Sequence, residues 1–230
     1  MNARPLEPLD TTAQFDDGSW AGRLFPGAGE FVGTMRLRSV GRPLTPSAAD
    51  DRCHEREGLL RGLRRVRRFV TANNLRLFVT TTFKRSPTVE SAVGEMERFL
   101  RRCRHDHDAF PFVWTLERGE KRGRLHGHML APVGLRATFE DAWSLGDVHS
   151  RVIGESLHEM RDQAKYLAKS FEDSVMPGQK YRVAKGFAPE AILIEADSRE
   201  SLLAEAETRM GSVAVVQSHS PMFISAQWGA

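Results

Sequence analysis

Alternating apolar and polar residues predict three β-strands in the middle of the chain. Residues 75–83 alternate so that Thr80 and Thr82 share one face of the first strand. Residues 110–119 and 122–132 alternate in the same way, because successive side chains of a strand point to opposite faces. We therefore expect these segments to pair in a sheet with one apolar face and one polar face.

Apolar residues that recur every three or four positions predict helices on either side of these strands. One helix is expected near residues 59–70, one over 89–103 and a long one over 155–173. Tyr166 and Lys169 lie one turn apart on the last of these, so they are neighbours on its surface. On residue types alone, this pair is also what the rim of an ordinary core looks like.

The two ends of the chain differ in composition from the middle. Residues 1–56 are rich in Gly, Pro, Asp and Ser and predict a partly irregular N-terminal extension. Residues 57–189 carry the predicted strands and helices of one domain, and residues 190–230 are acidic. In this C-terminal extension we expect a strand over 191–195 and a helix over 199–210, which either pack on the core or bind a partner.

Charge is unevenly spread although the net charge is only +3. The first predicted helix exposes five arginines with no acid between them, a pattern that can contact phosphates or simply form a solvated face. These arginines are Arg61, Arg64, Arg65, Arg67 and Arg68. No stretch is apolar enough to cross a bilayer and the N-terminus is not a signal peptide, so we expect a soluble, cytoplasmic protein without membrane contact.

Two histidines in the third predicted strand are the first candidate for chemistry. His126 and His128 are two residues apart, so their imidazoles project from the same face. A hairpin turn near Glu120 would place Glu117 opposite His126, where directly paired side chains lie about 5 Å apart. Two imidazoles and one carboxylate suit Mn²⁺, Mg²⁺ or Zn²⁺. The alternative for Glu117 is a solvated hairpin end.

The motifs occur in the order found in one known superfamily. A strand with the sequence FVTTTF, the HGH of residues 126–128 and the YLAK of residues 166–169 resemble the three motifs of HUH endonucleases. Over roughly residues 75–189 the chain is similar to single-tyrosine rolling-circle replication initiators of plasmids and of filamentous or single-stranded-DNA phages. One departure is Gly127, where the family usually has a bulky apolar residue; a glycine predicts closer backbone approach there. A second is the absence of a phosphate-binding helicase loop.

The resemblance implies an α+β fold with a ferredoxin-like or RRM-like central antiparallel sheet and helices on one face. The predicted element order of strand, helix, strand, strand, helix and strand, ending at residues 181–187, fits this fold independently. The resemblance also implies an enzyme that nicks single-stranded or hairpin origin DNA through a 5′-phosphotyrosine, then rejoins the ends.

In that interpretation the residues have separate roles. Tyr166 is the nucleophile and Lys169 assists it, while Glu117, His126 and His128 bind Mg²⁺ or Mn²⁺. The DNA contacts comprise the five arginines together with Thr80, Thr82, Arg182 and Lys185. A host helicase and polymerase are the expected partners. A transposase or relaxase with the same chemistry, or an inactive single-stranded nucleic-acid binder, are the alternatives.

Overall fold

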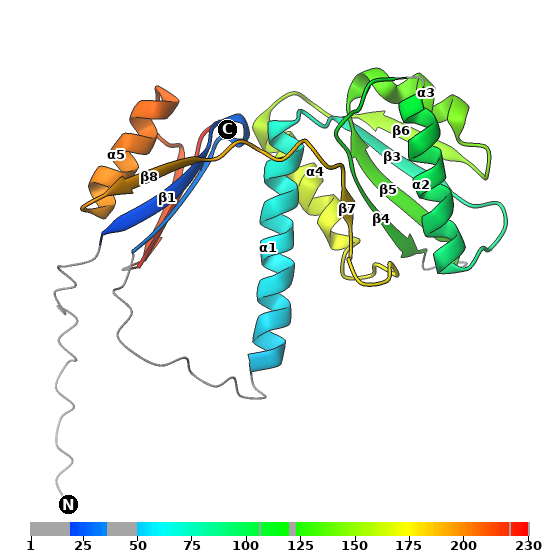
Figure 1. Ribbon diagram of the computed structural model, residues 1–230, viewed down its shortest axis with the longest axis horizontal. Coiled ribbons are helices and arrows are strands. Elements are labelled where there is room, and N and C mark those ends of the chain that lie inside the picture. The colour runs from blue at the N-terminus through cyan, green and yellow to red at the C-terminus, as the bar shows by residue number, and fades with distance from the viewer. Residues whose placement is uncertain (1–18, 36–49, 106, 120–122, 221, 230) are drawn as a thin grey trace, which may run out of the picture.

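The protein forms two antiparallel sheets with a pair of helices between them, as the computed structural model in Figure 1 shows. The structure describes residues 19–35, 50–105, 107–119, 123–220 and 222–229. The fold is α+β, as the sequence predicts. Within the described residues no helix is long and apolar enough to span a membrane.

One sheet contains the strands predicted from the sequence, in the order β6-β3-β5-β4-β7. In chain order these strands are β3 (Leu77–Thr82), β4 (Val113–Arg118), β5 (Leu125–Ala131), β6 (Val148–Val152) and β7 (Arg182–Val183). With helices α2 (Val89–His105) and α3 (Arg136–Ala142), the first four follow the ferredoxin-like order of strand, helix, strand, strand, helix and strand. A single 3-10 turn, η2 (Val133–Leu135), precedes α3.

The elements that complete this motif differ from the predicted ones. The sequence prediction assigned the second helix to residues 155–173 and the last strand to residues 181–187. In the structure α3 and β6 fill those places, while α4 (Leu157–Lys169) and the two-residue β7 come afterwards. Helix α3 has only seven residues, which is too short to show a helical period in the sequence.

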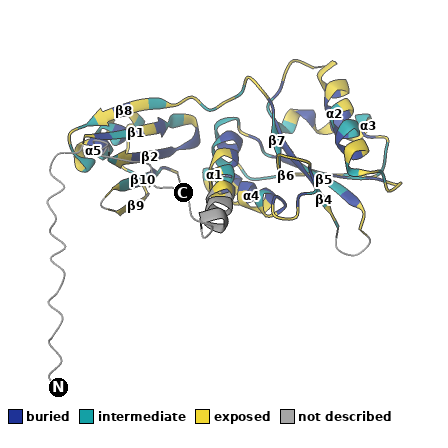
Figure 2. Cartoon of the chain, turned by 60° about the horizontal axis from the view of Figure 1, so that its bottom comes forward, coloured by how far each residue is buried: buried dark blue, intermediate teal, exposed yellow. Residues whose placement is uncertain are grey.

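Helices cover both faces of this sheet, because β3 is apolar on both sides. The face with Thr81 meets Met96 of α2, and the face with Phe78 meets Tyr166 of α4. Helix α1 (Asp50–Ala72) lies beside α4 (Figure 2). The ferredoxin-like helices α2 and α3 thus share one face (Figure 1), and α1 and α4 form an added layer over the other.

Gly127 allows the close approach that its residue type predicts. A Cβ atom built on Gly127 would lie 2.5 Å from Oγ1 of Thr81 and 3.0 Å from Cε of Met96. The Thr81 hydroxyl also donates to the carbonyl oxygen of Gly127 at 3.4 Å. The space that a bulky side chain would take is therefore filled by neighbouring atoms, and the backbone of the His126–His128 segment is fixed from below.

The other sheet, here called the terminal sheet, joins the two ends of the chain in the order β8-β1-β2-β10-β9. Its strands are β1 (Trp20–Phe25), β2 (Glu30–Met35), β8 (Ile192–Ala196), β9 (Val216–Ser220) and β10 (Phe223–Gln227), with the 3-10 turn η1 (Pro26–Ala28) between β1 and β2. Helix α5 (Arg199–Met210) packs on this sheet and buries Leu202 and Ala206 against Phe31. The predicted strand at 191–195 and helix at 199–210 are confirmed as β8 and α5.

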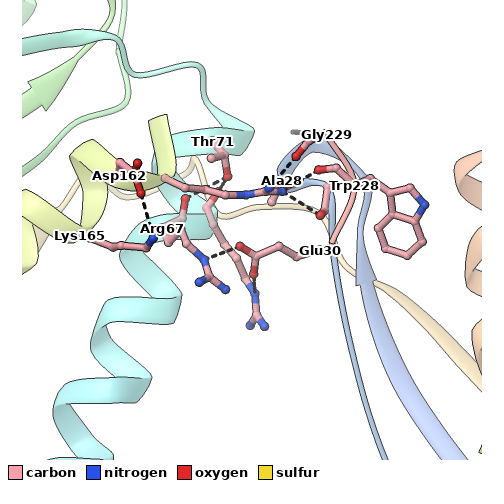
Figure 3. Close-up of polar contacts among 11 residues, drawn as sticks. Ala28, Glu30, Arg67, Thr71, Asp162, Lys165, Trp228 and Gly229 are labelled. Carbon is pink, nitrogen blue, oxygen red and sulfur yellow. Dashed lines mark hydrogen bonds and ion pairs between the residues drawn. The ribbon is translucent and has the colours of Figure 1, made fainter. Parts of the chain in front are cut away.

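A buried arginine of α4 ties the two halves together. The guanidinium of Arg161 donates to the carbonyl oxygens of Ala28, Gly29, Trp228 and Gly229 at 2.9–3.0 Å. Figure 3 shows Ala28, Trp228 and Gly229 at this end of the terminal sheet, facing α4 and α1. A charged donor that satisfies four otherwise buried acceptors holds α4 firmly against the terminal sheet.

Arg161→Leu should therefore destabilise the protein by about 3 kcal/mol or more, because four buried carbonyl groups lose a charged partner. Urea unfolding followed by circular dichroism measures this. Arg209→Leu is the control, because Arg209 only pairs with Glu205 at the surface of α5 and should cost below about 0.5 kcal/mol. Equal unfolding midpoints for the two variants would contradict the structural role of Arg161.

Candidate active site

The β4–β5 hairpin has the register that the sequence predicts. Glu117 pairs directly with His126, and Thr115 pairs with His128. The N–H of Gly119 donates to the carbonyl oxygen of Arg124 at 2.8 Å and closes the hairpin; residues 120–122 of the predicted turn lie outside the described residues. Glu117, His126 and His128 therefore share one face of the sheet.

Glu117 and His128 already contact each other. Nε2 of His128 lies 2.7 Å from Oε1 of Glu117, and Nδ1 of His128 lies 3.2 Å from Oγ1 of Thr80. A hydroxyl can both donate and accept, so Thr80 fits either tautomer of the ring. When it accepts from Nδ1, it leaves Nε2 free as a ligand, which is the usual outer-shell arrangement around a metal-bound histidine.

His126 lies farther from this pair. The ring centroids of His126 and His128 are 6.4 Å apart. The His126 ring fills the space beside Gly119, where an added Cβ would come within 2.6 Å of Nε2. Accordingly, no group of three His, Cys, Asp or Glu side chains in the described part of the chain is already arranged around one ion. Joint binding by all three residues would require the His126 ring to turn toward Glu117.

The protonation states nevertheless suit a cation. The hydrogen bond from His128 is the main cause that lowers the pKa of Glu117, and a hydrogen bond with Ser170 acts in the same direction. Burial is the main cause that lowers the pKa of His126, and His128 adds to it. Near neutral pH the carboxylate is thus ionised and the His126 ring is neutral, which are the forms that bind divalent metals.

The ring of Phe78 connects the histidines to the candidate nucleophile. The His128 ring stacks on Phe78 at 5.8 Å between centroids, and the Tyr166 ring meets Phe78 edge-on at 5.7 Å. The guanidinium of Arg151, on β6, lies over the same ring at 5.2 Å. Tyr166 is 53% exposed, so its hydroxyl remains open to a substrate.

Several contacts fix the position of α4 and hence of Tyr166. Ser156 and Glu159 form a capping box that starts the helix. Farther along, Gln163 accepts a hydrogen bond from Arg151 at 2.7 Å, and Arg161 anchors the opposite side. Near the C-terminal end, Ser170 bonds to Glu117.

Lys169 occupies a different side of α4 from Tyr166. It is exposed and lines a pocket of about 220 Å³ with Leu60 and Leu63 of α1. The structure therefore separates the contacts of the two residues that the sequence pairs: Tyr166 contacts the sheet and Lys169 faces α1. Its exposed ammonium group can meet a phosphate.

The five predicted arginines of α1 divide into two groups. Arg61, Arg64 and Arg65 are exposed. Arg67 and Arg68 instead form ion pairs with the buried carboxylate of Glu30, at 2.5 and 2.9 Å (Figure 3). Glu30 belongs to a strand of the terminal sheet, so the sequence of α1 alone could not reveal this partner.

The other predicted DNA contacts are also dispersed. Oγ1 of Thr82 accepts from the backbone N–H of Asp147 at 3.1 Å and so holds the loop before β6. Arg182 forms an ion pair with Glu97 of α2 and lies over Trp114, on the face opposite the histidines. Lys185 is exposed beyond β7. Of these residues only Thr80 touches the histidine pair.

The sequence reasoning missed three residues around this site. Phe78 and Arg151 lie on the same sheet face as Thr80, and their alternation in β3 and β6 was the available signal. Ser170 lies one residue beyond Lys169, but nothing in its spacing pointed to Glu117.

Comparison with known proteins agrees with this location of the site. Residues 76–174 match the model of a protein family described as replication-associated protein, of the ORF2 type. No curated protein and no solved structure gives a significant match. The matched range includes β3, the β4–β5 hairpin and α4, and it supports a role for this protein in the initiation of replication.

Proposed function

We propose that this protein is an HUH-type, single-tyrosine endonuclease that nicks single-stranded origin DNA and later rejoins it. One observation carries the proposal. Glu117, His128 and Tyr166 meet around the Phe78 ring on one sheet face, within the range that matches a replication-associated family. A metal-ligand pair beside an accessible tyrosine is what phosphodiester transfer to a protein requires.

In this mechanism the hydroxyl of Tyr166 attacks the phosphorus atom of one phosphodiester. The phenol loses a proton as its oxygen bonds to phosphorus, the bond from phosphorus to the 3′ oxygen breaks, and that oxygen takes up a proton. The product is a 5′-phosphotyrosine and a free 3′-hydroxyl group that a polymerase can extend. Because the phosphodiester is exchanged and not hydrolysed, the same step in reverse rejoins the strand.

The surrounding residues stabilise charge. Glu117, His126 and His128 would hold Mg²⁺ or Mn²⁺, which neutralises the phosphate oxygens and polarises phosphorus when it is bound. Arg151 places a positive charge beside the Phe78 ring that Tyr166 also contacts, and Lys169 offers a second cation one turn farther along α4. Both cations favour an anionic phosphate next to the phenol.

The direct test is incubation of the full chain with labelled single-stranded and hairpin oligonucleotides from the replicon that encodes it, in Mn²⁺. We expect a labelled band that migrates with the protein on a denaturing gel. If no substrate gives this band in Mg²⁺ or Mn²⁺ although the DNA binds, the protein is a nucleic-acid binder and the nicking proposal is wrong.

A further inference from the structure

A pocket of about 540 Å³ lies between α1 and the segment that leads into β7. Arg61 and Arg65 line it from α1, Lys180 and Tyr181 line it from the segment, and Phe171 lines it from just beyond α4. Glu117, the histidines and Tyr166 do not line it. Its volume lies within the range of about 300–1,000 Å³ that is usual for small-molecule sites.

One wall of this pocket is a fixed aromatic pair. The rings of Phe171 and Tyr181 stack at 4.6 Å between centroids with an interplanar angle of 20°. Phe171 is buried, and Tyr181 is only half-buried. Gly62 lets α1 approach, because a Cβ there would be 3.3 Å from Cε1 of Tyr181. The Tyr181 ring is thus held from two sides and remains partly accessible, as a platform for a planar ligand needs to be.

The rest of the pocket is cationic. Arg61, Arg65 and Lys180 are exposed, and no carboxylate is among the described residues that line the pocket. This distinguishes Arg61 and Arg65 from Arg67 and Arg68, which Glu30 neutralises. Guanidinium groups beside an aromatic wall that carries no acid match a ligand that is both anionic and planar.

The pocket is also linked to the candidate active site. The hydroxyl of Thr115, which pairs opposite His128, donates to the carbonyl oxygen of Lys180 at 2.7 Å. Ser174 forms a β-bridge with Glu117 at the start of the same segment. A strand of DNA that passes Tyr166 therefore has this pocket along its path on the same side of the sheet.

We propose that the pocket binds one unpaired nucleotide of the DNA, with the base against Tyr181 and phosphate groups on Arg61, Arg65 and Lys180. The inference rests on the proposed function, because it takes single-stranded DNA as the ligand. It adds a second contact outside the nicking site, which would hold the strand in register while Tyr166 reacts.

Two measurements on the full chain test this. With a fluorescein-labelled oligothymidylate of about 12 nucleotides, Tyr181→Leu should weaken binding about tenfold, because one base loses its stacking partner. The double variant Arg61→Gln/Arg65→Gln should lower the log–log salt slope by about 1.4 units, for two lost phosphate contacts on a single strand. Arg101→Gln, an exposed arginine on α2, is the matched control and should bind like wild type.

Photocrosslinking separates this inference from the nicking proposal. An oligonucleotide with 4-thiothymidine should crosslink to the peptide that contains Tyr181. If wild type binds DNA but both variants bind equally well and the crosslink maps elsewhere, the pocket proposal is overturned, whatever the nicking assay gives. A crosslink at Tyr181 without any Tyr166 adduct would support the pocket and overturn the nicking proposal. Absence of all binding by the wild type would overturn both.

Discussion

Tyr166→Phe is expected to abolish the covalent protein–DNA adduct while DNA binding persists. The substitution removes one oxygen and keeps the ring, so the edge-on contact with Phe78 should remain. Loss of the nucleophile removes the step itself, so the adduct should fall at least about 10³-fold, to the detection limit. A denaturing gel measures the adduct, and fluorescence anisotropy with the same oligonucleotide measures binding.

The control for this experiment is His158→Gln, an exposed change two turns earlier on α4. This variant should form the adduct at the wild-type level. Peptide mapping of the wild-type adduct should find the nucleotide on the peptide with residues 164–169. An adduct that survives in Tyr166→Phe, or that maps to Tyr181, would show that the nucleophile has been assigned to the wrong residue.

His128→Ala should reduce nicking about 10²-fold or more, because it removes a metal ligand and also the partner of Glu117. Excess EDTA should have the same effect on wild type. Binding should change little in either case, since it depends mainly on phosphate contacts by Arg and Lys. The initial rate of oligonucleotide cleavage in modest Mn²⁺ measures the effect.

A graded series makes this prediction specific. Thr80→Val removes only the hydroxyl group beside Nδ1 of His128, so it should lower nicking by about 10- to 100-fold, as outer-shell changes do. His219→Ala, at an exposed position in the terminal sheet, should have no effect. Full activity of His128→Ala in modest Mn²⁺ would rule out the assigned ligand set.

The local features of the sheet could be predicted from the sequence. Alternation in β3, β4 and β5 fixes which side chains share a face, and the short turn between β4 and β5 fixes the register. The pairing of Glu117 with His126 followed from these two facts alone. Helix α5 was predictable for the same reason, because Ser198 and Gly211 mark its ends and its period lies within one segment.

Other features depend on contacts between segments that are far apart in the chain. Residues 20–35 looked irregular because their strand partners lie at residues 192–196 and 223–227, and local patterns do not encode such pairing. For the same reason Glu30 was not visible as the partner of Arg67 and Arg68.

The candidate site shows the same division. The sequence by itself determined that Glu117, His126 and His128 share one face of a hairpin, since a strand's period of two and a short turn are local properties. Only the tertiary structure decided that Phe78 brings Tyr166 to His128 and that Lys169 turns toward α1. The orientation of α4 is the physical reason, because it is set by Arg161 and Gln163 through contacts with residues far away in the sequence.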